Sequence, residues 1–213
     1  MAILFDLDGT LIDSTEAIIE SFGVSFAHFA EPIPPKEKIT QHIGHPLEDM
    51  FASLGVSQES IDMHVVRYKE HYQKVSKQKT ILLPNAKEAV ELASKYAKLG
   101  VVTTKTGKFS KMLLEHLGLF EYFDVLIGRE DVLKPKPDAE PVIKALIKLN
   151  IDKKSCWMIG DTCMDILAAK AAGIYSTAVS SGYASVKNLR SCSDEKTIFN
   201  DTLDAVKYII KSY

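Results

Sequence analysis

In the stretch ILFDLDGTLIDST, residues 3–15, a short apolar run leads directly into two aspartates that stand two positions apart. Residues 2–7 form a short, mostly apolar run, and Gly9 follows shortly after it. Such a run is typical of a strand buried on both faces of a parallel sheet. Asp6 and Asp8 stand at its end. Aspartate is disfavoured inside a strand, and a buried carboxylate without a partner costs several kcal/mol. The stretch therefore predicts a compensating positive charge elsewhere in the chain.

Further apolar runs alternate with helical patterns along the rest of the chain. We expect strands at 99–104, 125–128, 156–160 and 176–179, and helices at 86–99, 108–117, 139–149 and 166–172. This alternation predicts an α/β fold with a Rossmann-like, doubly wound parallel sheet.

One long segment, residues 14–82, shows helical periodicity only. Its first helix is expected to have Asp13 as N-cap and to end at Pro32, with further helices at 36–43, 46–54 and 58–76. An insertion directly after the first strand predicts a small helical domain over the carboxyl edge of the sheet, where open α/β sheets bind ligands. We therefore expect a core domain of residues 1–13 and 83–213 and a helical domain of residues 14–82.

Composition excludes several classes of partner. The 213 residues carry a formal net charge of −2, which gives no electrostatic reason to expect nucleic acid or an anionic membrane surface. We find no apolar stretch near the ~20 residues needed to span a bilayer and no leader pattern. Cys156, Cys163 and Cys192 are odd in number and lack CxxC spacing, so we expect free thiols in a reducing compartment and a cytoplasmic protein.

A second acidic pair follows the strand expected at 156–160. Asp161 falls at the strand end and Asp165 one helical turn later, so both can face one point above the sheet. Paired carboxylates repel unless a cation or a shared proton lies between them. Mg²⁺ takes oxygen ligands, so we expect a magnesium site at this edge.

Hydroxyl and cationic groups follow two other strands. Thr103, Thr104 and Lys105 end the second strand, and Lys136 lies between two prolines in a turn after the third. A lysine in such a turn is usually solvated. Here it falls on the edge that carries the aspartates, so it is a candidate for the missing positive charge.

Together these residues resemble the motifs of the haloacid dehalogenase superfamily, in its phosphatase branch. Asp6-Leu-Asp8-Gly9-Thr10 resembles the first motif, Thr103 the second, Lys136 the third and Gly160-Asp161-Thr-x-x-Asp165 the fourth. The resemblance spans the whole chain and is closest to phosphoglycolate phosphatase-like members. It implies that the helical insertion is a type-one cap.

The resemblance also implies a mechanism. Asp6 would be the nucleophile that forms an aspartyl-phosphate, and Asp8 the general acid and base. Mg²⁺ would be held by Asp6, the backbone carbonyl of Asp8 and Asp161, with Asp165 as an orienting residue. The phosphoryl group would be bound by Gly9, Thr103, Thr104, Lys105 and Lys136.

The substrate is left open by these motifs. We expect a small phosphorylated metabolite such as phosphoglycolate, acted on by a monomer or homodimer. The cap candidates for substrate choice are Gly44-His45-Pro46, Arg67-Tyr68-Lys69 and His71-Tyr72. The alternatives are an inorganic pyrophosphatase, a sugar-phosphate phosphatase or β-phosphoglucomutase of the same superfamily and, outside enzymes, a phospho-acceptor signalling module.

Overall fold

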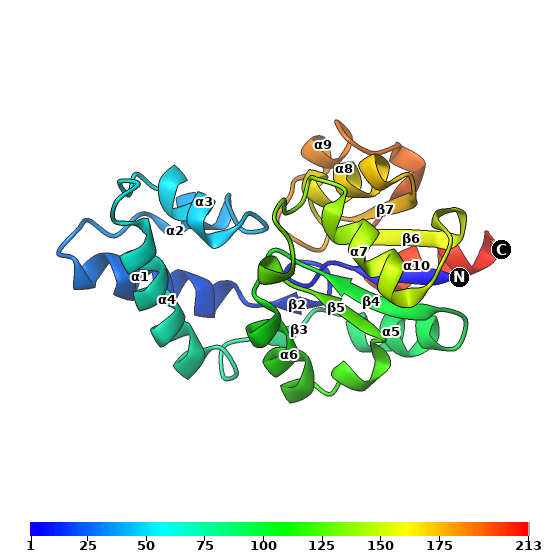
Figure 1. Cartoon of the computed structure of the whole chain (residues 1–213), viewed down its shortest axis with the longest axis horizontal. Coiled ribbons are helices and arrows are strands. Elements are labelled where there is room, and N and C mark those ends of the chain that lie inside the picture. Colours follow the sequence, from blue (N-terminus) through cyan, green and yellow to red (C-terminus); the bar gives the residue numbers. More distant parts are fainter. Residues whose placement is uncertain (213) are drawn as a thin grey trace.

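A six-stranded parallel sheet forms the centre of the protein in the computed structural model, which describes residues 1–212 (Figure 1). The strands are β1 (Ala2–Phe5), β4 (Lys98–Val102), β5 (Val125–Ile127), β6 (Cys156–Gly160), β7 (Tyr175–Val179) and β8 (Ile198–Phe199). Their order is β5-β4-β1-β6-β7-β8, so the chain extends the sheet on one side of β1 and then crosses to the other. Such a reversal point is where open α/β sheets bind ligands.

The register aligns the carboxyl ends of the central strands. Phe5 of β1 lies opposite Val101 of β4 and Ile159 of β6. The backbone N–H of Asp6 donates to the Ile159 carbonyl at 2.9 Å, which extends the pairing to the aspartate itself. The polar residues that follow these three strands therefore emerge at one level of the edge.

Helices cover both faces of the sheet. Ile3 and Phe5 pack against helices of one face, and Ala2 and Leu4 against those of the other, because strand side chains alternate. The first face carries α5 (Ala86–Ser94), α6 (Gly107–His116) and α10 (Thr202–Lys211), and the second α7 (Glu140–Leu149) and α8 (Cys163–Ala172). The short elements are α9 (Val186–Leu189), η1 (Phe120–Tyr122), η2 (Arg129–Asp131), η3 (Lys153–Ser155) and η4 (Glu195–Thr197).

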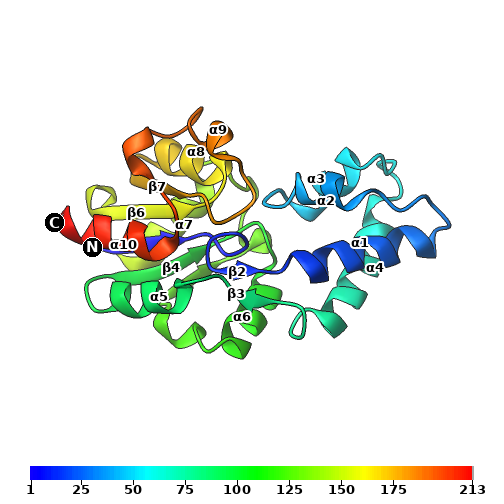
Figure 2. The ribbon, with the colours of Figure 1, turned by 180° about the vertical axis from the view of Figure 1, so that it is seen from behind.

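Four helices stand apart from the sheet, at the end of the molecule away from both termini (Figures 1 and 2). They are α1 (Thr15–His28), α2 (Lys36–Thr40), α3 (Leu47–Ser53) and α4 (Ile61–Val75), and we call them the helical unit. Phe22 and Phe51, with ring centroids 4.5 Å apart, pack among its buried aromatic residues.

The helical unit joins the sheet through two short strands. These are β2 (Ile12–Asp13) and β3 (Ile81–Leu82), which pair antiparallel with Ile12 opposite Leu82. The expected domain boundaries, at residues 13/14 and 82/83, fall on this pair. We propose the pair as the junction between the two domains.

The α/β fold with a Rossmann-like parallel sheet is confirmed, and each of the five expected strands is present. The two-residue strands β2, β3 and β8 and the helices α9 and α10 were not expected. The helix expected at 86–99 ends at Ser94, and the one expected to begin at 166 begins at Cys163. The N-cap of α1 is Ser14 and not Asp13, whose carboxylate instead accepts from the Thr15 backbone N–H at 2.9 Å.

The expectation of three free thiols is wrong. A disulfide joins Cys163 to Cys192, and Cys156 alone is a free, buried cysteine within residues 1–212. Residue spacing cannot show this pairing, because it depends on α9 bringing its following loop against the first turn of α8. No helix in the described part of the chain combines the length and hydropathy needed to cross a membrane.

Candidate active site

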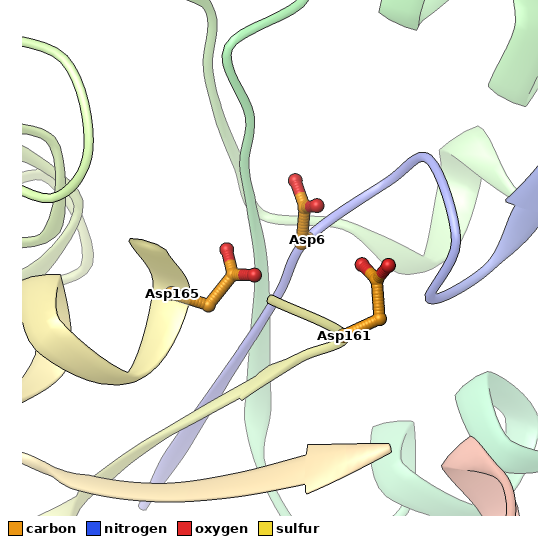
Figure 3. Close-up of side chains that lie close together, drawn as sticks. All are labelled: Asp6, Asp161 and Asp165. Carbon is orange, nitrogen blue, oxygen red and sulfur yellow. The ribbon is translucent and has the colours of Figure 1, made fainter. Parts of the chain in front are cut away.

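Three aspartates converge at the carboxyl edge of the sheet (Figure 3). Asp6 follows β1, Asp161 follows β6 and Asp165 lies in the first turn of α8. One carboxylate oxygen from each lies within 4.8 Å of the others, and all three residues are buried. Carboxylates at this separation can share one cation.

Lys136 supplies the positive charge that the sequence demands. Its Nζ donates to Asp6 Oδ1 at 2.8 Å, to Asp165 Oδ1 at 2.5 Å and to the Val102 carbonyl at 3.0 Å. The residue is only 3% exposed and precedes a cis bond to Pro137. Burial alone would lower the pKa of Lys136, but the two carboxylates outweigh it and raise that pKa, so the ammonium stays charged.

The cluster nevertheless carries an excess of negative charge. Three carboxylates and one ammonium sum to −2 when all are ionised. Burial is the main cause that raises the pKa of Asp6 to about 7, and it also raises the pKa of Asp161 well above its usual value. An oxygen-rich, buried site with two unbalanced negative charges fits a hard divalent cation such as Mg²⁺.

Two glycines make room for Asp161. A Cβ added to Gly9, which has φ +83°, would lie 2.3 Å from Asp161 Oδ2, and one added to Gly182 would lie 2.2 Å from the same atom. The Tyr183 backbone N–H donates to that oxygen at 2.8 Å, and the Thr10 hydroxyl donates to Oδ1 at 3.2 Å. Gly9 therefore borders the aspartate cluster directly.

Gly182 and Tyr183 are site residues that the sequence analysis missed. A signal for them was present, since they follow β7 as the motif residues follow β1, β4 and β6. Applying the strand-end argument to this strand as well would have included them.

The two carboxylate oxygens of Asp165 accept hydrogen bonds from different partners. Oδ1 accepts from Lys136, while Oδ2 accepts from the Thr162 backbone N–H at 3.1 Å and the Thr162 hydroxyl at 2.8 Å. The second pair of bonds closes a capping box at the start of α8. The capping box therefore fixes the orientation of the Asp165 side chain independently of its contact with Lys136.

Asp8 lies outside the three-carboxylate cluster and points toward the helical unit. Its Oδ1 accepts from the Ser14 hydroxyl, and its Oδ2 is paired with Lys105 Nζ at 3.2 Å. The Lys105 ammonium also donates to the Tyr72 hydroxyl of α4 at 2.9 Å and lies 4.6 Å from the centre of that ring. Asp8 and Asp6 thus have separate environments, each with its own lysine.

The threonines after β4 are engaged with the protein in different ways. Thr103 Oγ1 accepts from the Lys105 backbone N–H at 3.1 Å, and the residue is 5% exposed. Thr104 donates its hydroxyl to the Gly44 carbonyl at 2.8 Å, a contact between the sheet side and the helical unit. Their assignment to phosphate binding, like that of Gly9, Lys105 and Lys136, stays a prediction.

A cavity of about 70 Å³ lies between the helical unit and the sheet and reaches Asp8. Among the expected substrate-choosing residues, Gly44, His45, Tyr68, Lys69 and Tyr72 line it. The other three do not. Pro46 is the N-cap of α3, Arg67 pairs with Glu70, and His71 with Glu20.

Comparison with known proteins finds hydrolases among the relatives of this chain. A family model described as haloacid dehalogenase-like hydrolase matches residues 3–179. The pyrophosphatase PpaX of Bacillus velezensis is 36% identical over 183 residues, which cover 84% of this chain and 82% of the relative. The phosphoglycolate phosphatase of Yersinia pseudotuberculosis is 31% identical over 188 residues, which cover 85% and 81%. The solved structure of haloacid dehalogenase-like protein SP0104 from Streptococcus pneumoniae is 28% identical, with TM-score 0.88 over 97% of both chains.

Proposed function

Since the chain belongs to the haloacid dehalogenase-like hydrolase family, we propose that it is a Mg²⁺-dependent phosphatase that hydrolyses a small phosphomonoester through an aspartyl-phosphate. The observation that carries the proposal is the division of the two motif aspartates between different surroundings. Asp6 lies in the cation-deficient cluster, and Asp8 faces the cavity beneath the helical unit. A nucleophile and a separate acid-base group are what an aspartyl-phosphate mechanism needs.

Asp6 is the proposed nucleophile. Lys136 holds its Oδ1, and within residues 1–212 the structure records no hydrogen-bond donor to Oδ2, so that oxygen is free to attack phosphorus. In this proposal, Asp6, Asp161 and the backbone carbonyl of Asp8 would hold the ion. Bound Mg²⁺ would supply charge that offsets repulsion between the attacking carboxylate and the phosphoryl oxygens.

Asp8 is the proposed general acid and base. It would give its proton to the leaving alkoxide and later take one from the water that hydrolyses the aspartyl-phosphate. Ser14 and Lys105 fix its carboxylate in position. Thr103, Lys136 and the backbone near Gly9 would bind the phosphoryl oxygens, as charge stabilisation in a buried site requires.

Pyrophosphate is the second candidate substrate, and the relatives favour it. PpaX proteins of several bacteria match this chain at 33–36% identity, against 31% for the phosphoglycolate phosphatase. A sugar phosphate is the third candidate, and neither of the two curated relatives compared above is named for one. A phospho-acceptor signalling module is disfavoured by the family match, because the matched family is one of hydrolases.

The proposal extends to partner and compartment. We propose a small phosphorylated metabolite as the partner, with no nucleic acid or membrane partner, a monomer or homodimer as the assembly, and the cytoplasm as the compartment. The compartment now rests on the substrate class alone, and the Cys163–Cys192 disulfide counts against it, because disulfides are rare in the reducing cytosol.

A phosphate-release assay tests the function. The purified protein with Mg²⁺ is offered phosphoglycolate, pyrophosphate, sugar phosphates, nucleotides and p-nitrophenyl phosphate. We expect turnover that stops with a chelator and returns with Mg²⁺. A preference of about 100-fold for one substrate, or about 2.7 kcal/mol, decides the substrate class. Absence of turnover on the whole panel contradicts the proposal.

A further inference from the structure

The loop after β7 lies against both the aspartate cluster and the start of the helical unit, and Tyr183 in this loop contacts both. Its backbone N–H donates to Oδ2 of Asp161 at 2.8 Å. Its hydroxyl shares a hydrogen bond of 3.1 Å with the hydroxyl of Thr15, the first residue of α1. One residue therefore joins a proposed metal ligand to the helical unit.

The ring of Tyr183 lies where the chain leaves room for it at Gly9. A Cβ added to Gly9 would lie 2.8 Å from Cδ2 of the ring. The ring is half-buried and packs against the main hydrophobic core, and the neighbouring Ser181 hydroxyl donates to the Gly9 carbonyl at 3.5 Å. Because the ring is enclosed, a displacement at its hydroxyl end is transmitted to the backbone N–H that holds Asp161.

The first turn of α1 also supports the proposed acid-base residue. Ser14, which directly precedes Thr15, is the N-cap of α1 and donates its hydroxyl to Asp8 Oδ1. The placement of this turn therefore decides where Ser14 presents its hydroxyl to Asp8. Through Thr15, Tyr183 acts on the partner of the acid-base residue as well as on the metal ligand.

Tyr183 reaches the helical unit from the side of β1 opposite to the contacts after β4. Those contacts are the hydrogen bonds of Thr104 with the Gly44 carbonyl and of Lys105 with the Tyr72 hydroxyl. In the sheet order β5-β4-β1-β6-β7-β8, strands β4 and β7 lie on opposite sides of β1. A helical unit held on one side alone can tilt about that side, and a contact on the other side opposes the tilt. The bond between Tyr183 and Thr15 is therefore not duplicated by the contacts after β4.

We propose that Tyr183 is a positioning residue that couples occupancy of the metal site to placement of the first turn of α1. This inference rests on the metal dependence in the proposed function. Asp161 is held more firmly when it binds a cation, and it then fixes the Tyr183 backbone, whose side chain fixes Thr15. Because coupling between two sites is reciprocal, the contact with Thr15 strengthens cation binding by the same factor.

Calorimetry with Mg²⁺ and no substrate measures the coupling without turnover. Tyr183→Phe removes the hydroxyl and keeps the ring and the backbone N–H, and Thr15→Val removes the partner. Each should weaken Mg²⁺ binding by about 3- to 10-fold, the effect of one hydrogen bond. The double variant should bind no more weakly than either single variant, because all three lose the same contact. Unchanged affinity in both single variants, or effects that add in the double variant, would overturn the inference.

Two further variants are matched controls. Tyr208→Phe removes a phenol hydroxyl from α10, where the ring packs against Trp157 and Phe199, and should leave Mg²⁺ affinity unchanged. Thr15→Ser keeps a hydroxyl at the start of α1 and should bind Mg²⁺ as the parent does. If Tyr208→Phe weakens binding as much as Tyr183→Phe, or Thr15→Ser as much as Thr15→Val, the effects are structural and the inference fails.

Hydrogen exchange gives the reciprocal measurement. The Ile18 backbone N–H donates to the Ser14 carbonyl at 3.0 Å, so its exchange rate reports opening of the first turn of α1. Saturating Mg²⁺ should slow this exchange by about 3- to 10-fold in the parent and by much less in Tyr183→Phe, because the coupling factor is the same in both directions. An equal effect of Mg²⁺ in parent and variant would contradict the coupling.

The outcomes separate this inference from the proposed function. A protein that shows the coupling but hydrolyses no phosphate compound would refute the phosphatase proposal alone. A Mg²⁺-dependent phosphatase in which Tyr183→Phe changes neither Mg²⁺ affinity nor the effect of Mg²⁺ on exchange at Ile18 would refute the coupling alone. A parent protein that binds no Mg²⁺ would refute both.

Discussion

Asp6 illustrates how a residue that is proposed to act in catalysis can be unfavourable for stability. Its carboxylate is buried beside two others, with a single lysine among them. The burial that raises its pKa to about 7 is a cost that the folded protein carries in the absence of a bound cation. Active sites commonly hold groups in this condition.

Asp6→Asn should reduce turnover by at least about 10³-fold, because an amide cannot act as the nucleophile. The fold should persist, since asparagine has the same shape. Phosphate release measures the first effect, and far-UV circular dichroism the second. A folded variant that keeps a substantial fraction of the parent rate would show that Asp6 is not the nucleophile.

The raised pKa of Asp6 predicts a pH dependence of stability in chelator-treated protein. Between about pH 4 and pH 7 the folded state holds a proton that the unfolded state has released. The free energy of unfolding should therefore fall as pH rises through this window. Urea midpoints at pH 5 and pH 8 measure the fall. Asp6→Asn should reduce it, and Mg²⁺ at pH 8 should reverse it. Equal pH dependence in parent and variant would contradict the assigned cause.

Gly182→Ala should reduce activity and Mg²⁺ affinity by about 10- to 100-fold, the usual cost of disturbing a residue that supports a metal ligand. The added Cβ would lie 2.2 Å from Asp161 Oδ2 and must displace the carboxylate. Gly23→Ala is the control, because its Cβ would meet only Ile33 Cγ2 at 3.8 Å. Kinetics at a series of Mg²⁺ concentrations separate the two effects. Similar behaviour of both variants would show that Asp161 can move freely.

The aspartates and Lys136 could be predicted at this scale because each stands in a short motif directly after an apolar strand. The hydrogen-bond and ion-pair partners of Asp8 could not be predicted from the sequence. Ser14 and Lys105 are separated from it by 6 and 97 positions, and nothing in the spacing shows that one carboxylate would bind both. The contacts of Tyr183 depend equally on the loop after β7 folding back.

At the scale of elements, periodicity identified the central strands and most of the long helices, because their apolar patterns extend over several residues. It missed α10, although that helix has ten residues. It could not identify β2, β3 and β8, which have two residues each. A two-residue strand has no measurable alternation, and its existence is decided by the neighbour it pairs with. The start of α8 was placed three residues late, although the capping box formed by Thr162 and Asp165 marks that start in the sequence.

The first turn of α8 is stabilised by a capping box and by a disulfide. Thr162 and Asp165 cap it, and the disulfide from Cys163 ties it to Cys192 beyond α9. The same turn carries Asp165 to Lys136. Loss of the disulfide should therefore affect a structural segment that also positions the site.

Cys192→Ser should lower the free energy of unfolding by about 2–4 kcal/mol, as expected for opening a covalent loop of moderate length. The separation of the two cysteines is 29 residues. Denaturant unfolding of the parent, with and without reductant, should show a loss of the same size. Thiol titration of the unfolded parent should find one thiol before reduction and three after it. Three thiols without reductant would show that the bond does not form.

At the scale of the whole molecule, the helical unit and the sheet side meet through several polar contacts, which include Thr15 with Tyr183 and Glu48 with Arg129. Two others lie at the loop after β4. The hydroxyl of Thr104 reaches the Gly44 carbonyl, and Lys105 reaches Tyr72. Both contacts lie beside the proposed catalytic acid-base group. With the helical unit against the sheet, which we call the closed arrangement, Asp8 is largely shielded from water. Exclusion of water strengthens the electrostatic interactions of its carboxylate.

Thr104→Val should raise KM by about 3- to 10-fold with a smaller change in kcat, because it removes one hydrogen bond that favours closure. Thr177→Val is the matched control, since the Thr177 hydroxyl is buried without a partner, the residue does not line the cavity, and loss of the hydroxyl should be neutral or stabilising. Steady-state kinetics and thermal unfolding distinguish the two. Unchanged KM in Thr104→Val would show that this contact does not limit closure.

As the proposed junction between the two domains, the β2–β3 pair would make the helical unit an exchangeable module. Asp13 and Ile81 already lie opposite each other in antiparallel strands, so a two-residue turn could connect them without moving the strands that carry Asp6, Thr103 and Asp161. An inserted helical segment of a different length could be joined at the same two points. Under the proposed function, substrate recognition could therefore diverge between relatives, or be grafted in the laboratory, provided that the new segment keeps a hydroxyl at the position of Ser14, which donates to Asp8.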